Sequence, residues 1–237
     1  MEFNLTVEKN KENVAIMFND IATTYDFLNH FLSGNTDKLW RKKAVKMLSA
    51  CSPKTILDVA TGTGDLAIAM LKLHPEKIVG IDIAGEMLDI ARKKIARLGK
   101  QQIVKLKQAD AENIPFPDAS FNAVTVAFGI RNFEHLNKGI AEIYRVLSPK
   151  GMFLILEFSR PKNIFFGFLF KCYFRYILPF LGRFFSKNKI AYKYLYRSVQ
   201  QFPNVNEMKN NLSSQGFVNV SAKTLSMGIT TIYTALK

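Results

Sequence analysis

Three acidic residues stand at or just after the ends of short apolar runs that are typical of strands: Asp58, Asp82 and Asp110. In an open parallel sheet, ligands bind beyond the carboxyl ends of the strands, near the point where the strand order reverses. A carboxylate at the position of Asp82 can accept both hydroxyl hydrogens of a ribose. Asp110 can accept from an adenine amino group, with Ala111 leaving room for the ring. These positions predict a nucleoside-binding site.

A glycine-rich loop, residues 58–65 (DVATGTGD), follows the first of these runs. Gly62 and Gly64 let the backbone approach a ligand where a Cβ would collide. Gly62-x-Gly64-x-x-Ala67 also satisfies the dinucleotide fingerprint of a nicotinamide-dependent dehydrogenase. A pyrophosphate, however, prefers helix N-termini without nearby carboxylates, and Asp58 and Asp65 flank this loop. A cationic, phosphate-free ligand such as S-adenosylmethionine suits it better, because a carboxylate can meet the ligand's amino group.

The runs that carry these residues alternate with helical patterns, which predicts an α/β fold with a mostly parallel sheet covered on both faces. Strands are expected at 55–60, 77–83, 104–108, 121–127 and 152–158, and helices at 10–48, 65–73, 86–98 and 138–147. Residues 148–151 (SPKG) predict a turn. Two strand-like runs near the end, 218–225 and 229–236, are expected to close the edge of the sheet as a hairpin.

Length and composition set the limits of these interpretations. The 237 residues suit one domain, 1–237, with a helical cap at 10–48 and an insertion at 160–200. The net charge of +14 favours polyanionic partners, either nucleic acid or an anionic membrane. Two cysteines without CxxC spacing predict neither a disulfide framework nor a zinc site, and no metal is expected. The first residues lack a signal-peptide pattern, so a cytoplasmic location is expected.

The segment 160–200 contains nine basic residues, thirteen aromatic residues and no acidic residue. Lys171, Arg175 and Arg183 interrupt its most apolar part, so it does not predict a transmembrane helix. Aromatic and basic residues together suit the interface of an anionic membrane. A core helix or a homodimer surface is the alternative. RNA binding by base stacking is disfavoured, because the segment is aliphatic as well as aromatic.

Several blocks of residues resemble the ubiquinone/menaquinone biosynthesis C-methyltransferase family of class I methyltransferases. The resemblance covers the chain from about Val14 onward, and the blocks are residues 17–26 (MFNDIATTYD) with Leu28-Asn29, Trp40-Arg41, 56–65 with 80–83, 128–132 (FGIRN), 156–161 (LEFSRP), 173–179, and Ser198 with Phe202-Pro203. It implies a Rossmann-like, seven-stranded and mostly parallel sheet with an N-terminal helical cap and a late helical lid.

The resemblance also implies a reaction, the transfer of a methyl group from S-adenosylmethionine to a ring carbon of a prenylated demethylmenaquinol. The family's cofactor contacts fall on Thr63, Asp82, Asp110 and Ala111 of this sequence. Ala127 stands where relatives often have serine, and its backbone can still serve. Because the substrate tail lies in a bilayer, we expect a peripheral location on the inner face of the cytoplasmic membrane.

The acceptor is expected beside Arg131 and Asn132, which follow the fourth predicted strand. Arg131 is predicted to stabilise a developing phenolate, or alternatively to pair with an acid such as Glu134. Asn132 is predicted to position a hydroxyl group or a water. Tyr25 can cap the methionine end of the cofactor or face the core, and His30 is an outside candidate for the base that removes a phenolic proton.

Other functions remain open from the sequence. Within the enzymes, the alternatives are the ubiquinone-pathway methylation or methylation of another lipid, such as a phospholipid amine. Outside the enzymes, the alternative is an inactive cofactor-binding subunit with an assembly or regulatory role. The intact glycine loop and the carboxylates Asp82 and Asp110 argue against the inactive subunit.

Overall fold

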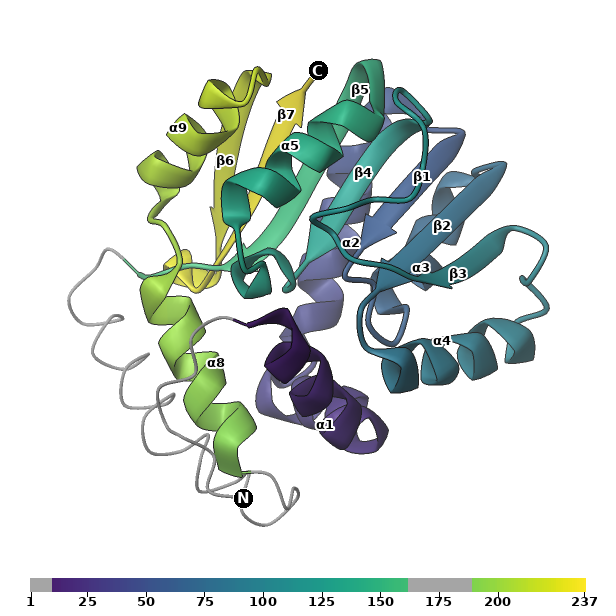
Figure 1. The fold of residues 1–237 in the computed structure, drawn as a ribbon, viewed down its shortest axis with the longest axis vertical. Coiled ribbons are helices and arrows are strands. Elements are labelled where there is room, and N and C mark those ends of the chain that lie inside the picture. The colour runs from purple at the N-terminus through teal and green to yellow at the C-terminus, as the bar shows by residue number, and fades with distance from the viewer. Residues whose placement is uncertain (1–9, 162–188) are drawn as a thin grey trace.

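A seven-stranded sheet forms the centre of the protein in a computed structural model, which describes residues 10–161 and 189–237. The strand order is β3-β2-β1-β4-β5-β7-β6. Neighbours from β3 to β5 are parallel, whereas β7 is antiparallel to both β5 and β6. The order reverses between β1 and β4, so the switch point lies there. This arrangement confirms the predicted seven-stranded, mostly parallel α/β fold (Figure 1).

Most elements lie close to the predicted ranges, but the helix expected at 10–48 is two helices, and a helix at Val205–Ser214 was not predicted. The strands are β1 (Thr55–Val59), β2 (Lys77–Asp82), β3 (Val104–Gln108), β4 (Phe121–Ala127), β5 (Leu147–Phe158), β6 (Val218–Leu225) and β7 (Thr230–Leu236). The helices are α1 (Lys11–Leu32), α2 (Thr36–Leu48), α3 (Asp65–Met70), α4 (Gly85–Arg97), α5 (Leu136–Val146), α8 (Lys189–Gln201) and α9 (Val205–Ser214). A 3₁₀ turn, Ile130–Asn132, follows β4.

The turn predicted at residues 148–151 is wrong, because β5 runs through it. Ser148 Oγ donates to Phe121 O at 2.9 Å, and Lys150 N donates to Lys237 O at 2.9 Å. These bonds keep the segment in the sheet, and the register with β4 shifts between Phe121 and Ala123. Lys150 takes a left-handed backbone angle of φ 64°. The proline and glycine therefore mark an irregular strand rather than the end of one.

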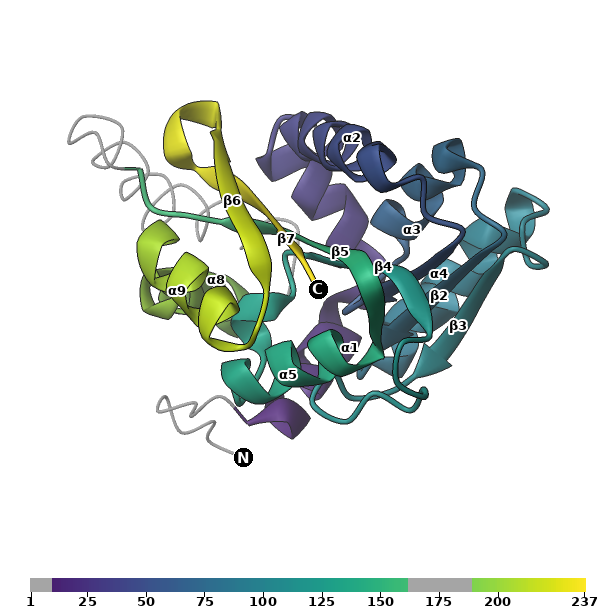
Figure 2. The ribbon, with the colours of Figure 1, turned by 90° about the horizontal axis from the view of Figure 1, so that it is seen from above.

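Helices cover both faces of the sheet, as Figure 2 shows from above. Alternate strand residues explain this, since Ile56 and Leu156 pack with α2, α3 and α4 on one face. Leu57 and Ile155 pack with α5 and α9 on the other face. Of the predicted helical cap, α2 thus belongs to a layer of the core, and only α1 lies across the carboxyl ends of the parallel strands.

Two helices from distant parts of the sequence lie at this end of the sheet. α1 contacts α4, and α8 contacts the 3₁₀ turn that follows β4 (Figure 1). The part of the predicted lid between 162 and 188 is outside the described residues. Among the helices that the structure does describe, none combines the length and apolarity needed to cross a membrane.

Candidate functional site

A pocket lies between α1 and the carboxyl ends of β1, β2, β3 and β4. Its lining comes from all of the loops that follow these strands and from one face of α1: Lys11, Val14, Phe18, Tyr25, Ala60, Gly62, Asp82, Ile83, Met87, Ala109, Asp110, Ala111, Glu112, Ala127, Phe128, Gly129, Asn132, Phe133 and Glu134. The fold therefore has a pocket at the switch point of the sheet, where the sequence predicted a binding site. Seven of the predicted site residues line it, namely Tyr25, Gly62, Asp82, Asp110, Ala111, Ala127 and Asn132.

Asp82 ties the end of β2 to the glycine loop. Its two oxygens accept from the backbone N–H groups of Gly62 at 2.8 Å and Ala84 at 2.9 Å. Burial raises the pKa of this carboxyl, although the backbone donors oppose the effect. Gly62 has φ 56°, and a Cβ built on it would meet no protein atom within 4 Å. Gly62 also lines the pocket, so a ligand there can pass close to its backbone.

Asp110 lies at the opposite side of the pocket, in the turn after β3. Its Oδ1 accepts from Glu112 N at 2.8 Å, and its Oδ2 is 2.9 Å from Lys11 Nζ of α1. Burial acts to raise the pKa of Asp110, but these donors outweigh it and lower the pKa overall. The adjacent Ala111 is buried and leaves space beside the carboxylate.

The charges of the lining test whether the implied cofactor fits. Four lining residues are acidic (Asp82, Asp110, Glu112 and Glu134), and Lys11 is the single basic residue in this lining. The surrounding apolar groups include Met87, Ile83 and Phe133. An acidic pocket with an apolar slot suits a nucleoside that carries a positive charge, and it disfavours a pyrophosphate. The acidic and apolar lining therefore fits S-adenosylmethionine.

Asp58, a predicted cofactor contact, does not line the pocket. It is buried within β1 at 1% exposure. Thr61 Oγ1 donates to it at 2.7 Å and Thr125 Oγ1 donates at 2.6 Å. Burial raises its pKa to about 6, although both hydroxyl groups oppose the shift. In this geometry Asp58 holds the glycine loop against β4.

Thr63 and Gly64 are also absent from the pocket lining. Thr63 Oγ1 donates to Asp26 of α1 at 2.5 Å, and Lys94 Nζ of α4 lies 2.9 Å from the other oxygen of Asp26. Lys94 also pairs with Asp65 at the start of α3. Lys94 therefore neutralises Asp65 of the glycine loop and Asp26 beside it, a pairing that the sequence did not predict.

Arg131 is buried at 4% exposure and does not line the pocket. Its Nη1 is 2.8 Å from Glu157 Oε1 and also donates to Phe128 O, and its Nε donates to Ser198 Oγ at 3.3 Å. Arg131 therefore pairs with an acid, as the alternative prediction stated, but the acid is Glu157 of β5 and not Glu134. The predicted contact between Arg131 and a phenolate has no support in this arrangement.

Asn132 and Tyr25 do reach the pocket from two sides. Asn132 is half-buried in the turn after β4, and its Oδ1 accepts from Tyr194 Oη of α8 at 3.1 Å. Tyr25 projects from α1, where its ring meets that of Phe18 edge-on with centroids 5.9 Å apart. Burial raises the pKa of Tyr25, so its hydroxyl group stays protonated at neutral pH.

His30 belongs to a charged cluster that joins α1, α2 and the start of α3. Its Nδ1 lies 2.7 Å from Asp37 and its Nε2 lies 3.6 Å from Asp65. These three side chains are close enough to hold a cation. Arg41 pairs with both carboxylates, so the cluster already contains its compensating charge. His30 is absent from the pocket lining, which gives no support to its role as the base.

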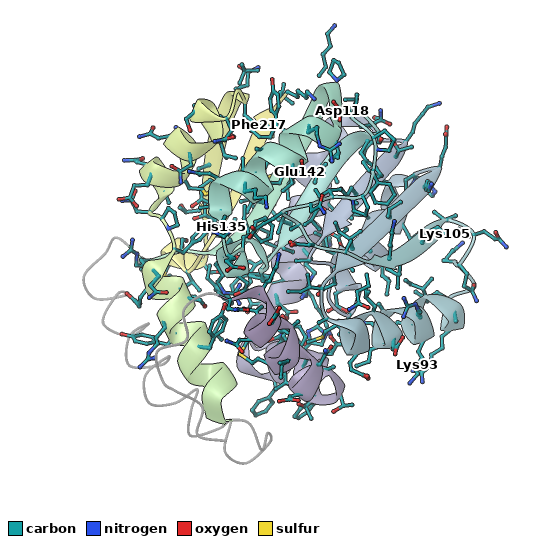
Figure 3. The ribbon with its side chains drawn as sticks, viewed as in Figure 1. Lys93, Lys105, Asp118, His135, Glu142 and Phe217 are labelled. Atoms are coloured by element: carbon teal, nitrogen blue, oxygen red, sulfur yellow. The ribbon has the colours of Figure 1, made fainter. Side chains whose placement is uncertain are left out.

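The other two histidines are exposed. His74 follows α3, and His135 is the N-cap residue of α5 (Figure 3). His135 is largely exposed, although its backbone N–H and its Nδ1 contact the buried Glu112 at 2.7 Å and 3.0 Å. Figure 3 also shows the exposed Lys93 and Lys105 projecting outward from α4 and β3.

Sequence reasoning missed four residues around the site: Lys11, Lys94, Glu157 and Tyr194. Only Glu157 gave a signal, because it is a lone carboxylate in the apolar run of residues 152–158 (MFLILEF). A charge in a fully buried strand needs a partner of opposite charge. The contacts of the other three depend on how distant helices pack, which the spacing of residues does not encode.

Comparison with known proteins defines the class and then the family. A methyltransferase from Aquifex aeolicus, described as SAM-dependent, has the same fold with a TM-score of 0.55 at 20% identity, covering 77% of this chain and 81% of that one. Together with the sheet order and the pocket, this likeness places the fold among the class I, Rossmann-like methyltransferases.

The family follows from sequence. Residues 6–237 match the model of the ubiE/COQ5 methyltransferase family. A demethylmenaquinone methyltransferase of Bacteroides fragilis is 43% identical over 97% of this chain and 94% of its own length. A ubiquinone/menaquinone biosynthesis C-methyltransferase of Geotalea daltonii is 44% identical over 95% of this chain and 97% of its own length. The chain belongs to the ubiE/COQ5 methyltransferase family.

Proposed function

We propose that this protein methylates demethylmenaquinol to menaquinol with S-adenosylmethionine as the methyl donor. The observation that carries the proposal is the match over nearly the whole chain to relatives that bear this activity in their names. The acidic pocket at the switch point supports it, because it suits a cationic nucleoside. Asn132 and Tyr25 reach the same pocket, so a methyl acceptor has polar groups to meet there.

Asp82 and Asp110 are proposed to hold the two ends of the cofactor's nucleoside. The donors on Asp82 are backbone N–H groups, which leave further lone pairs of its oxygens free to accept from ribose hydroxyl groups. Asp110 is proposed to accept from the adenine amino group, with Ala111 against the ring. Gly62 provides the close backbone approach, and the backbone of Ala127 lines the same pocket.

Thr63, Gly64 and Asp58 are proposed to act on the cofactor through the loop rather than by direct contact. Asp58 fixes the loop to β4, and Thr63 connects it to Asp26 of α1. A loop held from both sides keeps its backbone donors in place before the ligand arrives. Such preorganisation reduces the entropic cost of binding.

The chemistry at the acceptor is proposed to depend on alignment and exclusion of water. When bound, S-adenosylmethionine supplies an electrophilic methyl group, so the protein must place a nucleophilic carbon in line with it. A quinol becomes nucleophilic at carbon as its hydroxyl group ionises, whereas the oxidised quinone does not. Tyr25 and Asn132 are the polar groups that can contact the ring oxygens, and α1 closes the pocket above them.

Most of the segment 160–200, for which membrane contact was predicted, lies outside the described residues. Membrane contact is proposed instead for the exposed surfaces of α1 and α2. α1 exposes Ile16 at 49%, and α2 exposes Leu39 at 64% beside a row of exposed lysines, Lys38, Lys42 and Lys46. Residues one helical turn apart lie on one side of a helix, so this row forms a single basic face. Such a face suits anionic headgroups at the inner side of a cytoplasmic membrane.

Sedimentation with vesicles tests this contact. The purified chain should bind vesicles that contain anionic lipid and should bind zwitterionic vesicles weakly. Replacing Lys42 and Lys46 by glutamate should reduce binding to the anionic vesicles. The same exchange at Lys93 and Lys105, which project elsewhere, is the matched control. Equal binding of all three proteins to both kinds of vesicle would remove this part of the proposal.

Methyl-labelled S-adenosylmethionine tests the reaction itself. The purified protein should transfer label to reduced demethylmenaquinone, and it should not label the oxidised quinone or RNA. A demethylated ubiquinone precursor belongs in the same assay, because the Geotalea daltonii relative is named for both quinones. Asp82→Asn should weaken cofactor affinity by about tenfold, since one charge-assisted acceptor is lost. Label in RNA, or in no acceptor although the cofactor binds, would contradict the proposed substrate.

A further inference from the structure

One face of α8 contacts both polar residues of the turn after β4. Tyr194 Oη donates to Asn132 Oδ1 at 3.1 Å, and Arg131 Nε donates to Ser198 Oγ at 3.3 Å. Tyr194 and Ser198 are four positions apart, so they lie one above the other on the helix. α8 therefore stands behind the residues that were predicted to meet the methyl acceptor.

In this structure the hydrogen bond from Tyr194 occupies the carbonyl end of the Asn132 amide. The carbonyl oxygen is engaged by the phenol, whereas no described residue accepts from Nδ2. Asn132 is half-buried and lines the pocket. Its remaining groups are therefore two N–H donors, on a residue that lines the pocket.

The groups around this bond hold it in place. Ser198 is buried at 1% exposure and donates to Leu195 O at 3.0 Å, which leaves its oxygen to accept from Arg131. Asn132 N donates to Gly129 O at 2.9 Å, which closes the turn. Burial raises the pKa of Tyr194, so its hydroxyl group remains a donor at neutral pH. The backbone that carries Tyr194 and the backbone that carries Asn132 are thus both held in place by neighbouring hydrogen bonds.

We propose that Tyr194 is a positioning residue that turns the Asn132 amide so that its N–H groups face a ring oxygen of the acceptor. This inference rests on the proposed function. A donor at this point stabilises an ionised quinol oxygen more than a neutral one, because hydrogen bonds to charged acceptors are stronger. It therefore lowers the pKa of the bound quinol and increases its nucleophilic form at neutral pH.

Tyr194→Phe tests this role, because it removes the hydroxyl group and keeps the ring. We expect kcat to fall about tenfold near neutral pH, with the affinity for S-adenosylmethionine unchanged. The deficit should shrink as pH rises, because the quinol then ionises without help. Tyr196→Phe, at a half-buried tyrosine of the same helix, is the matched control and should keep wild-type kinetics.

A double-mutant cycle separates positioning from general damage. Once Asn132→Ala has removed the amide, adding Tyr194→Phe should cost nothing further, since Tyr194 acts through that amide. Additive losses, or a loss that is the same at every pH, would overturn the proposal. An unchanged melting temperature of Tyr194→Phe confirms that the fold is intact.

The proton–nitrogen NMR signals of the Asn132 side-chain amide give a readout without turnover. They are assigned by their absence in Asn132→Ala, and Tyr194→Phe should shift them whereas Tyr196→Phe should not. Unshifted signals in Tyr194→Phe would overturn the inference regardless of activity. If the signals shift but wild-type protein methylates no quinol, the proposed function fails and the positioning of the amide by Tyr194 stands.

Discussion

Replacing Asp58 by asparagine should change how the stability of the protein depends on pH. The Asp58 carboxyl is buried at 1% exposure, and burial raises its pKa from the ordinary 3.8 to about 6. Its neighbours Thr61 and Thr125 both donate to it. Asparagine has the same shape, and its NH₂ group can donate to one of the two hydroxyl groups, because a threonine accepts as well as donates.

The magnitude follows from linkage between folding and protonation. Because the folded-state pKa is the higher one, the folded protein keeps a proton that the unfolded chain has released at intermediate pH. The contribution of Asp58 to stability is thus fully present below about pH 4 and is lost as pH rises through about 6. A pKa shift of roughly two units amounts to about 3 kcal/mol of stability. About 2 kcal/mol of this is lost as pH rises from about 4.5 to 7.5.

Denaturant unfolding at a series of pH values measures this effect. Asp58→Asn carries no titrating group, so its free energy of unfolding should rise relative to wild type by about 2 kcal/mol over that range. Taking the difference between the two proteins cancels the titration of all other carboxyl groups. Asp20→Asn, on the exposed side of α1, is the control and should give a flat difference. A flat difference for Asp58→Asn too would refute the reasoning.

Three further substitutions test other parts of the structure. Glu157→Ala leaves the buried Arg131 without its partner, so it should lower the free energy of unfolding in urea by about 3–5 kcal/mol, and a loss under about 1 kcal/mol would contradict the buried ion pair. Gly64→Ala should cost about 1–2 kcal/mol and lower the melting temperature, because φ is 81° and the new Cβ would stand 3.2 Å from Ala91 Cβ. Asn204→Ala removes the capping box of α9 and should cost about 1 kcal/mol by thermal unfolding, and an unchanged melting temperature would argue against the cap.

The strands and the position of the pocket could be predicted from sequence because both depend on local patterns. Apolar runs such as residues 121–127 determine which segments enter the sheet, and the alternation with helices makes them parallel. Since parallel strands end at one edge, Asp82 and Asp110 come together there without any knowledge of helix packing. α9 was missed although Asn204 and Glu207 have the capping-box spacing, which was a readable signal.

The partners of Arg131 could not be predicted in the same way. Glu157 is 26 positions away, and the two meet because β4 and β5 are neighbours with Ala127 opposite Leu156. Glu134 is closer in the chain, and sequence distance therefore favoured the wrong acid. Register between strands and the docking of α8 decide this contact, and neither is encoded in the spacing of the residues themselves.

The carboxylates of the glycine loop likewise have partners that are distant in the sequence. Asp58 and Asp65 flank the loop in sequence, which suggested direct recognition of a cationic ligand. In the folded chain, Asp58 is enclosed by hydroxyl groups and Asp65 is paired with Lys94 from α4. The acidic character nevertheless survives in the pocket, because Asp82 and Asp110 line it together with Glu112 and Glu134. Selection of a cationic nucleoside over a pyrophosphate thus follows from the ends of β2 and β3, and the loop contributes its backbone shape.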